Sequence, residues 1–230
     1  MHILINDQIQ NSDAPIAAKS PALAELCYEN PLTVTFDSTV SVSHFGIGNT
    51  DATEVQLEIH HIVGIAPAVT NVTVALGTRN KNGLYEISAA PLNVQYIIIT
   101  HNGNYFGRIG AGIGLQIGTG RAKEPGIQST NESRITLSGQ VIPGSGGYSY
   151  RSVGLDSRYK LGQSFFDEVD AAYQNQIGRG FPFFILFDCE TSRLPFDRLY
   201  ANDKNQTKWA FEGSIRQMLY SFKFNFIERF

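Results

Sequence analysis

Apolar and polar residues alternate with a period of two through much of the first half of the chain. The alternation is clear at Leu32–His44, at Val55–Val63 and at Val72–Leu76. Because successive side chains of a β-strand point to opposite faces, these segments are predicted to be half-buried strands. Val94–Thr100 is apolar on both faces, which is typical of a strand at the centre of a sandwich. Many short strands at regular spacing predict a β-sandwich.

Two segments depart from this alternation. Up to about Asn30 the pattern is loose and is interrupted by Pro15 and Pro21, so we expect an arm or an extended strand there. Between Gly107 and Gly120, glycines are interspersed with apolar residues. Glycine permits bulges and close approach of the backbone, so this stretch is predicted to be a tightly packed, curved strand that closes the sandwich.

The pattern changes after the polar segment Arg121–Ser133, which contains Pro125 and Gly126 and is the predicted domain boundary. Beyond it, Ile135–Ile142 and Tyr148–Lys160 are predicted to be two long strands joined by a glycine-rich turn. We expect these two strands to pair as a hairpin.

A helix is predicted next. Ser164 and Asp167 resemble a capping box, and apolar residues follow at spacings of three and four until Gly178. Phe181–Phe187 is then predicted to be a buried strand, and Ser221–Phe226 alternates strictly with phenylalanine on one face.

Together these elements predict a mainly β fold. Residues 1–122 are expected to form the N-terminal arm and a jelly-roll-like β-sandwich. Residues 123–230 are expected to form a smaller α+β module with a β-hairpin, one helix and aromatic strands.

The composition of the chain argues against two classes of binding partner. The chain has 18 basic and 21 acidic side chains and a net charge of -3, so we expect neither nucleic acid nor a membrane as partner. No apolar run reaches the ~18 residues of a membrane-spanning helix. Met1–Gln10 lacks the features of a secretory signal, so the chain is expected to stay in a cytosol after synthesis. In that compartment Cys27 and Cys189 are expected to be reduced packing thiols.

The sequence contains no motif that predicts catalysis. Ser157 and Lys160 have the S-x-x-K spacing, but in a strand they would point to opposite faces. The glycines match neither nucleotide-binding loop, and the five histidines lack paired metal-ligand spacing. Acidic residues cluster in the first turn of the predicted helix, where the helix dipole explains them: Asp167, Glu168 and Asp170. We therefore expect no enzymatic activity, cofactor or metal, and a hydrolase has no acid and base pair to support it.

Three aromatic residues are candidates for contact with a ligand. Tyr85, Tyr105 and Phe106 lie near polar loops rich in asparagine, where they could stack on a sugar ring or on a partner chain. We favour packing in the core or against a partner protein over sugar binding.

Several segments resemble proteins of bacteriophage virions. The run HFGIGNTDAT that begins at His44, together with Val55–Ile59 after it, resembles the galactose-binding-like, discoidin-type sandwiches of such proteins. In the second half, the similar segments are Ser138–Gly144, Asp156–Lys160, Ile177–Phe184 and Tyr220–Phe224. Together these segments span most of the chain.

The resemblance implies a structural protein of a phage tail, an adaptor that docks tail fibres or other appendages through protein contacts. Its partners would be other tail proteins, such as the tail tube, fibres or baseplate-like components, with several copies around the tail axis. It would be made in the bacterial host cytoplasm and reside in the virion tail. The alternative is a host-glycan-binding module of the virion, with Tyr85, Tyr105 and Phe106 as contacts.

Overall fold

The protein is built mainly of antiparallel β-strands, as its alternating sequence predicted. The computed structural model describes residues 2–4, 7–20, 25–76, 82–116, 121–129, 134–135, 141–142, 149–161, 182–186, 198–203, 208–211 and 220–228. Side chains are described at 2–4, 7–20, 25–76, 82–115 and 182–186. Within this part of the chain every strand pair is antiparallel.

The first sheet has four strands in the order β2-β7-β4-β5. Their bounds are Leu32–Val42 for β2, Leu92–His101 for β7, Glu54–Val63 for β4 and Ala66–Ala75 for β5. The predicted alternation is confirmed in β4, whose residues Val55, Leu57 and Ile59 are buried. Full burial of such a side chain stabilises the fold by about 1.5–3 kcal/mol. Strand β7 lies in the interior of the sheet, as its apolar sequence predicted, but it is not buried on both faces: Gln95 and Thr100 are exposed.

The second sheet has three strands in the order β6-β3-β8. Their bounds are Gly83–Glu86 for β6, His44–Ile47 for β3 and Ile109–Gly112 for β8. Residues of both sheets belong to one buried cluster, which includes Val34, Leu57 and Ile99 from the first sheet and Phe45 and Ile109 from the second. The main core therefore lies between these two sheets.

The other face of the second sheet packs against the second half of the chain. Gly46 and Gly110 are cross-strand partners in β3 and β8, and the ring of Phe184 lies over both. Leu4, Leu84 and Phe184 form a small buried cluster at this joint. The predicted close packing of the glycine-rich stretch is thus confirmed at Gly110, where a Cβ would come within 2.7 Å of the Phe184 ring.

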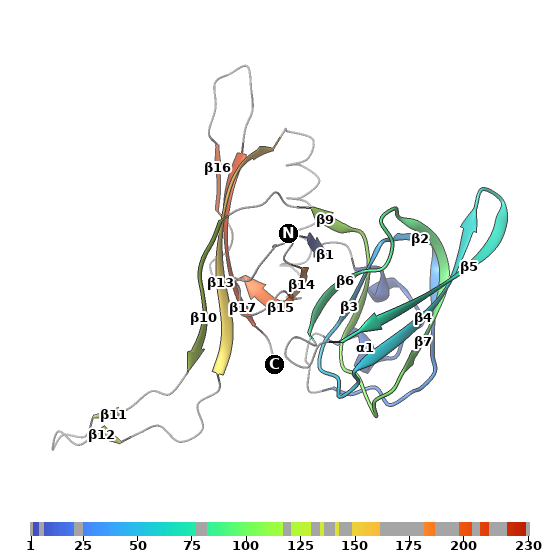
Figure 1. Ribbon diagram of the computed structural model, residues 1–230, viewed down its shortest axis with the longest axis horizontal. Coiled ribbons are helices and arrows are strands. Elements are labelled where there is room, and N and C mark those ends of the chain that lie inside the picture. The colour runs from blue at the N-terminus through green and yellow to red at the C-terminus, as the bar shows by residue number, and fades with distance from the viewer. Residues whose placement is uncertain are drawn as a thin grey trace.

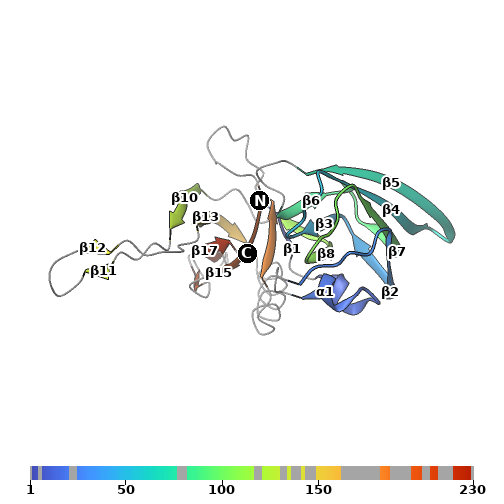
Figure 2. The same ribbon diagram turned by 90° about the horizontal axis from the view of Figure 1, so that it is seen from below.

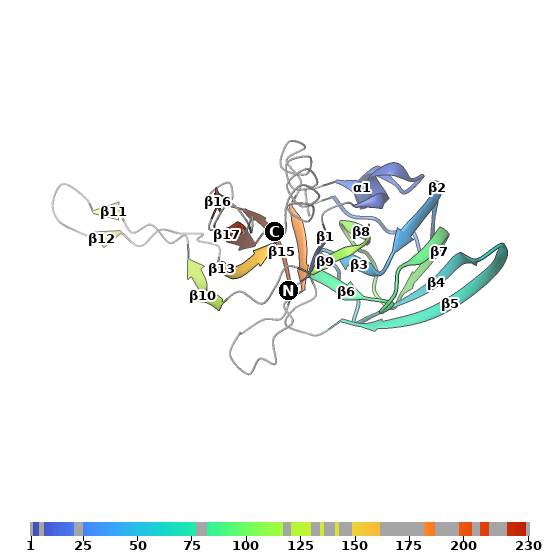
Figure 3. The same cartoon turned by 90° about the horizontal axis from the view of Figure 1, so that it is seen from above.

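The N-terminal arm covers the outer edge of β2. It contains the strand β1 at His2–Leu4, the 3-10 helix η1 at Gln8–Asn11 and the short helix α1 at Ile16–Lys19. The arm runs along β2, where the backbone N–H of Asp13 donates to the carbonyl of Thr35 at 3.0 Å. Figures 2 and 3 show α1 beside β2, on the side of the first sheet away from β5.

The third and largest sheet joins both ends of the chain. Its eight strands follow the order β10-β13-β17-β15-β14-β1-β9, with β16 paired to β17 outside this path. The strand bounds are Arg121–Ser129 for β10, Ser149–Leu161 for β13, Tyr220–Glu228 for β17, Arg198–Asp203 for β15, Phe183–Leu186 for β14, Gly114–Gln116 for β9 and Lys208–Phe211 for β16. Strand β1 lies between β14 and β9, so the first residues of the chain connect the two halves (Figure 1).

One predicted pairing in the second half is wrong. Strand β13 pairs with β10 and with β17. The predicted strand Ile135–Ile142 instead contributes to a small separate pair, β11 at Arg134–Ile135 with β12 at Val141–Ile142. The polar segment that we expected to be a boundary thus forms a strand. The pairing register of β10 with β13 shifts between Lys123 and Gly126, where β10 forms a bulge. The bulge accommodates Pro125, which a regular ladder would exclude because proline has no N–H to donate.

The other predictions for the second half have different outcomes. Strands β13, β14 and β17 confirm the strands predicted from Tyr148, Phe181 and Ser221 onward. The helix predicted from Ser164 to Gly178 lies outside the described residues. The boundary after residue 122 falls within β10, and the division into two domains stays a prediction. In the part of the chain that the structure describes, no helix is long and apolar enough to cross a membrane.

Candidate interaction surfaces

Two of the three predicted contact residues are part of the core. Tyr85 in β6 is 4% exposed and Phe106 is fully buried. Phe106 packs edge to face against His101, with 5.2 Å between ring centroids, and its backbone bonds with Cys27 in both directions. Burial in the core agrees with the favoured interpretation of these two rings, and it excludes Tyr85 and Phe106 as sugar contacts in this structure. They follow polar loops in sequence, but the adjacent backbone turns them into the space between the sheets.

The third residue, Tyr105, lies at a partly exposed loop surface beside Tyr28. Their rings meet edge to face with 6.3 Å between centroids, and Tyr28 is 67% exposed. Sequence reasoning missed Tyr28, because it lies in the loose N-terminal segment and nothing local indicates that it meets Tyr105. A tyrosine pair at a loop surface can contact a sugar or an apolar side chain.

The loop that carries Tyr105 is held by Asp51. The Asp51 carboxylate accepts hydrogen bonds from the backbone N–H groups of Asn104 at 2.9 Å and Tyr105 at 3.2 Å, and from the Asn104 side chain at 2.8 Å. Partial desolvation raises the pKa of Asp51, but these hydrogen bonds outweigh it and lower the pKa below its ordinary value. Thr50 adds a hydrogen bond from its hydroxyl to the Tyr105 carbonyl at 2.7 Å. Tyr105 is therefore presented from an ordered loop.

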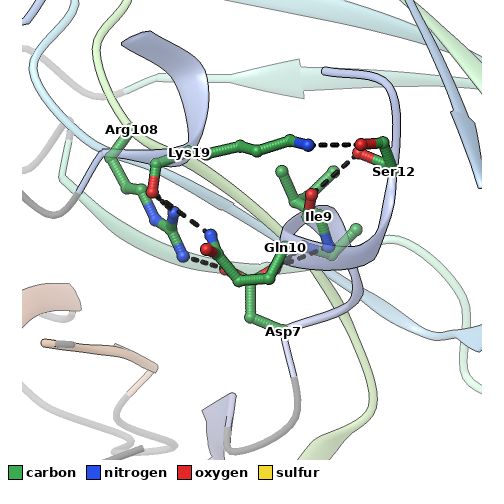
Figure 4. A network of polar contacts seen from close by, with 7 residues as sticks. Asp7, Ile9, Gln10, Ser12, Lys19 and Arg108 are labelled. Carbon is green, nitrogen blue, oxygen red and sulfur yellow. Dashed lines mark hydrogen bonds and ion pairs between the residues drawn. The ribbon is translucent and has the colours of Figure 1, made fainter. Parts of the chain in front are cut away.

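A buried ion pair fixes the N-terminal arm. Arg108, which is 2% exposed, pairs with the carboxylate of Asp7, and that carboxylate also accepts hydrogen bonds from the backbone N–H groups of Ile9 and Ala111, both at 3.1 Å. Figure 4 shows Arg108 reaching both Asp7 and the carbonyl of Lys19. Burial raises the pKa of Asp7, while Arg108 and the two N–H groups act in the opposite direction. These contacts join the arm to β8 and pair the two buried charges with each other.

The adjacent histidines in β4 face opposite sides of the sheet, as predicted. His61 is buried and bonds to the Thr70 hydroxyl at 2.9 Å. His60 lies on the outer face, stacked on Tyr96 with 4.0 Å between centroids and bonded to Glu58 at 2.6 Å. Within the described residues, no three His, Cys, Asp or Glu side chains gather as a metal site.

Several other predicted residues can also be placed. Cys27 is a buried free thiol, as expected, and burial raises its pKa, whereas Cys189 lies outside the described residues. Ser157 and Lys160 both lie in strand β13, as predicted, and the acidic residues from Asp167 to Asp170 lie outside the described part.

The most exposed apolar residues of the described chain include a group at the far end of the β4–β5 hairpin. Ile65 is fully exposed, Val63 is 62% exposed and Val69 is 51% exposed. The hairpin extends past the ends of β2 and β7 (Figure 1). This end of the first sheet is therefore an apolar surface on a projecting element, which is typical of a protein contact.

Comparison with known proteins identifies no relative. No protein-family model, curated protein or solved structure matches the chain.

Proposed function

We propose that the protein is a structural component of a bacteriophage tail, an adaptor that docks tail fibres or other appendages onto the tail. The proposal rests on the virion-protein resemblance of the sequence and on one structural observation, the projecting ribbon formed by β10, β13 and β17. Several copies would surround the tail axis, in contact with tail tube, fibre or baseplate-like proteins.

The ribbon supports an assembly role through its shape. Strand β13 pairs with β10 on one side and β17 on the other, and β11 and β12 pair beyond the end of this array (Figure 1). Among the described residues, β10 has a strand partner on one side only, so its other side is an edge that can pair with a further strand. A neighbouring protein in an assembly can pair with this edge.

The first half supports the finer fold proposal. A four-stranded and a three-stranded sheet bury one core between them, and this supports the proposal of a jelly-roll-like sandwich of the galactose-binding-like type. In this arrangement the sandwich is the compact unit and the ribbon is the extension that reaches a neighbour.

Purified virions test the adaptor proposal. Mass spectrometry should detect the protein in particles, at a copy number that is a fixed multiple of the tail symmetry. Deleting the gene should leave particles that lack fibres or other appendages in electron micrographs. Complete, infectious tails without the protein would contradict the proposal.

A second candidate function is binding of host glycans, which the pair formed by the exposed Tyr28 and the partly exposed Tyr105 favours. Both rings lie at one loop surface, and Asp51 orders the loop beneath Tyr105. A glycan array with the whole protein would test it, with Tyr28→Ala and Tyr105→Ala expected to abolish any signal. A signal that both variants retain would exclude this tyrosine pair as the binding site.

A further inference from the structure

Strand β5 is an open edge of the first sheet. It pairs with β4 along one side, in an unbroken register from Ala66 opposite Val63 to Ala75 opposite Glu54. Among the residues that the structure describes, no strand pairs with its other side. Figures 2 and 3 show β5 at the outside of the molecule, away from the large sheet.

The backbone groups on this open side can be assigned from the hairpin geometry. Val63 and Ala66 flank a two-residue turn at Gly64 and Ile65, so they form a hydrogen-bonded pair. In an antiparallel ladder such pairs alternate, so the even-numbered residues of β5 bond to β4. The N–H and C=O groups of Val69, Asn71 and Thr73 therefore point to the open edge.

The opposite edge of the same sheet is protected. On β2, Asp13 bonds to both backbone groups of Thr35: its carboxylate accepts from the N–H at 2.6 Å, and its own N–H donates to the C=O at 3.0 Å. Strand β2 also carries Asp37 next to a shift in register. Bulges, charged side chains and covering segments are the features that keep an edge strand from pairing with a strand of another molecule.

Strand β5 lacks most of these protective features. From Ala66 to Ala75 it contains no Asp, Glu, Lys or Arg, its register has no bulge, and no described segment covers it. Its one protective feature is Pro67, which removes a single N–H from the end of the open edge. A long, uncharged, regular edge of this kind is a template for another strand.

We propose that the occupant is β5 of a second copy, paired antiparallel about a two-fold axis at Asn71. In this register the two Asn71 residues exchange backbone hydrogen bonds, and Val69 of each copy pairs with Thr73 of the other. The Pro67 carbonyl still accepts a bond from the Ala75 N–H of the second copy. The two four-stranded sheets then form one continuous sheet.

Charge and symmetry favour a second copy as the occupant. A strand with a charged residue at its centre would repel the same strand of a second copy. Strand β5 is uncharged over its whole length, so two copies of it can pair without electrostatic repulsion. All of the facing side chains at Val69, Asn71 and Thr73 are exposed in the single chain, so pairing displaces no buried contact. Because the arm covers the other edge of the sheet, the association closes as a dimer and does not extend into a fibre.

Sedimentation velocity of the full chain across a concentration series tests the pairing. The wild type should dimerise, and Asn71→Lys should raise the dimer Kd at least about tenfold, because two like charges then face each other at the axis. Mixing Asn71→Lys with Asn71→Glu should restore a dimer that neither variant forms alone. That rescue occurs only if Asn71 faces its own copy.

Thr100→Lys is the matched control. Thr100 is exposed on the same face, and Thr73 and Thr100 flank the same β4 residue, Gln56, but Thr100 lies inside the sheet. The control should dimerise like the wild type. If an Asn71 variant misfolds, hydrogen exchange of the wild-type protein tests the same pairing. The amides of Val69, Asn71 and Thr73 should become more protected from exchange as the protein concentration rises. A monomeric wild type, or a dimer that Asn71→Lys leaves intact, would overturn the proposal.

Discussion

The ring of Phe184 lies directly on the backbone of Gly46. A Cβ placed on Gly46 would come within 2.5 Å of the Phe184 ring, a separation that real side chains do not adopt. Gly46 belongs to β3 in the first half and Phe184 to β14 in the second, so this contact is part of the joint between the halves. The absence of a side chain at Gly46 is what allows the aromatic ring to close on the sheet.

Gly46→Ala is therefore expected to destabilise the protein by about 1–3 kcal/mol, the usual cost of adding a methyl group to a filled site. Urea unfolding would measure the loss. Combining it with Phe184→Leu, which frees space above the glycine, should cost less than the sum of the two single changes. Additive costs would show that the ring and the added methyl group do not compete for space.

The buried pair of Asp7 and Arg108 should be stabilising only while both members are present. Asp7→Asn keeps the shape but leaves the Arg108 charge without its counterion, which is expected to cost about 3–5 kcal/mol. Adding Arg108→Met should recover part of this loss in thermal or urea unfolding. Limited proteolysis should also cut the arm of the single variant faster, because the arm depends on this contact. Near wild-type stability of Asp7→Asn would refute the assignment.

Stability should fall on mild acidification because of His101. This side chain is 5% exposed, and burial lowers its pKa below the ordinary value, although the Asp51 carboxylate acts in the opposite direction. An unfolded histidine binds a proton near pH ~6.5, whereas the folded one stays neutral to lower pH. The His101 contribution is thus fully present above that pH and is lost as pH falls toward the folded pKa, by up to about 1.4 kcal/mol per unit.

His101→Phe keeps an aromatic ring against Phe106 and removes this titration. Unfolding midpoints measured between neutral and mildly acidic pH should decline less steeply for the variant than for the wild type. Parallel declines would assign the acid sensitivity to other groups.

At Gly64, in the turn of the β4–β5 hairpin, the cost of a substitution should depend only on how well the new residue adopts the backbone conformation. Gly64 has a φ of 64°, and a Cβ there would meet nothing within 4 Å. Gly64→Val is therefore expected to cost about 1–2 kcal/mol of backbone strain, and Gly64→Asn distinctly less. Equal stabilities of the two variants would contradict this explanation.

Much of the local structure followed from the sequence. The alternation of Val55, Leu57 and Ile59 predicted a half-buried strand, and the opposite faces of His60 and His61 followed from the same period. These predictions succeed because strand geometry makes side-chain direction depend on immediate neighbours in the chain. The uncharged run from Ala66 to Ala75 was equally visible in the sequence, but only its position at a sheet edge made it a candidate contact.

Tertiary structure decided the rest. The burial of Tyr85 and Phe106, the pairing of β10 with β13, and the meeting of Asp7 with Arg108 across 101 residues depend on which segments come together in space. Many pairings satisfy the same alternating pattern, and the choice among them rests on packing, such as the fit of Phe184 over Gly46. Local periodicity thus determined which residues form strands, while the joint packing of distant side chains determined how the strands are ordered and which surfaces remain exposed.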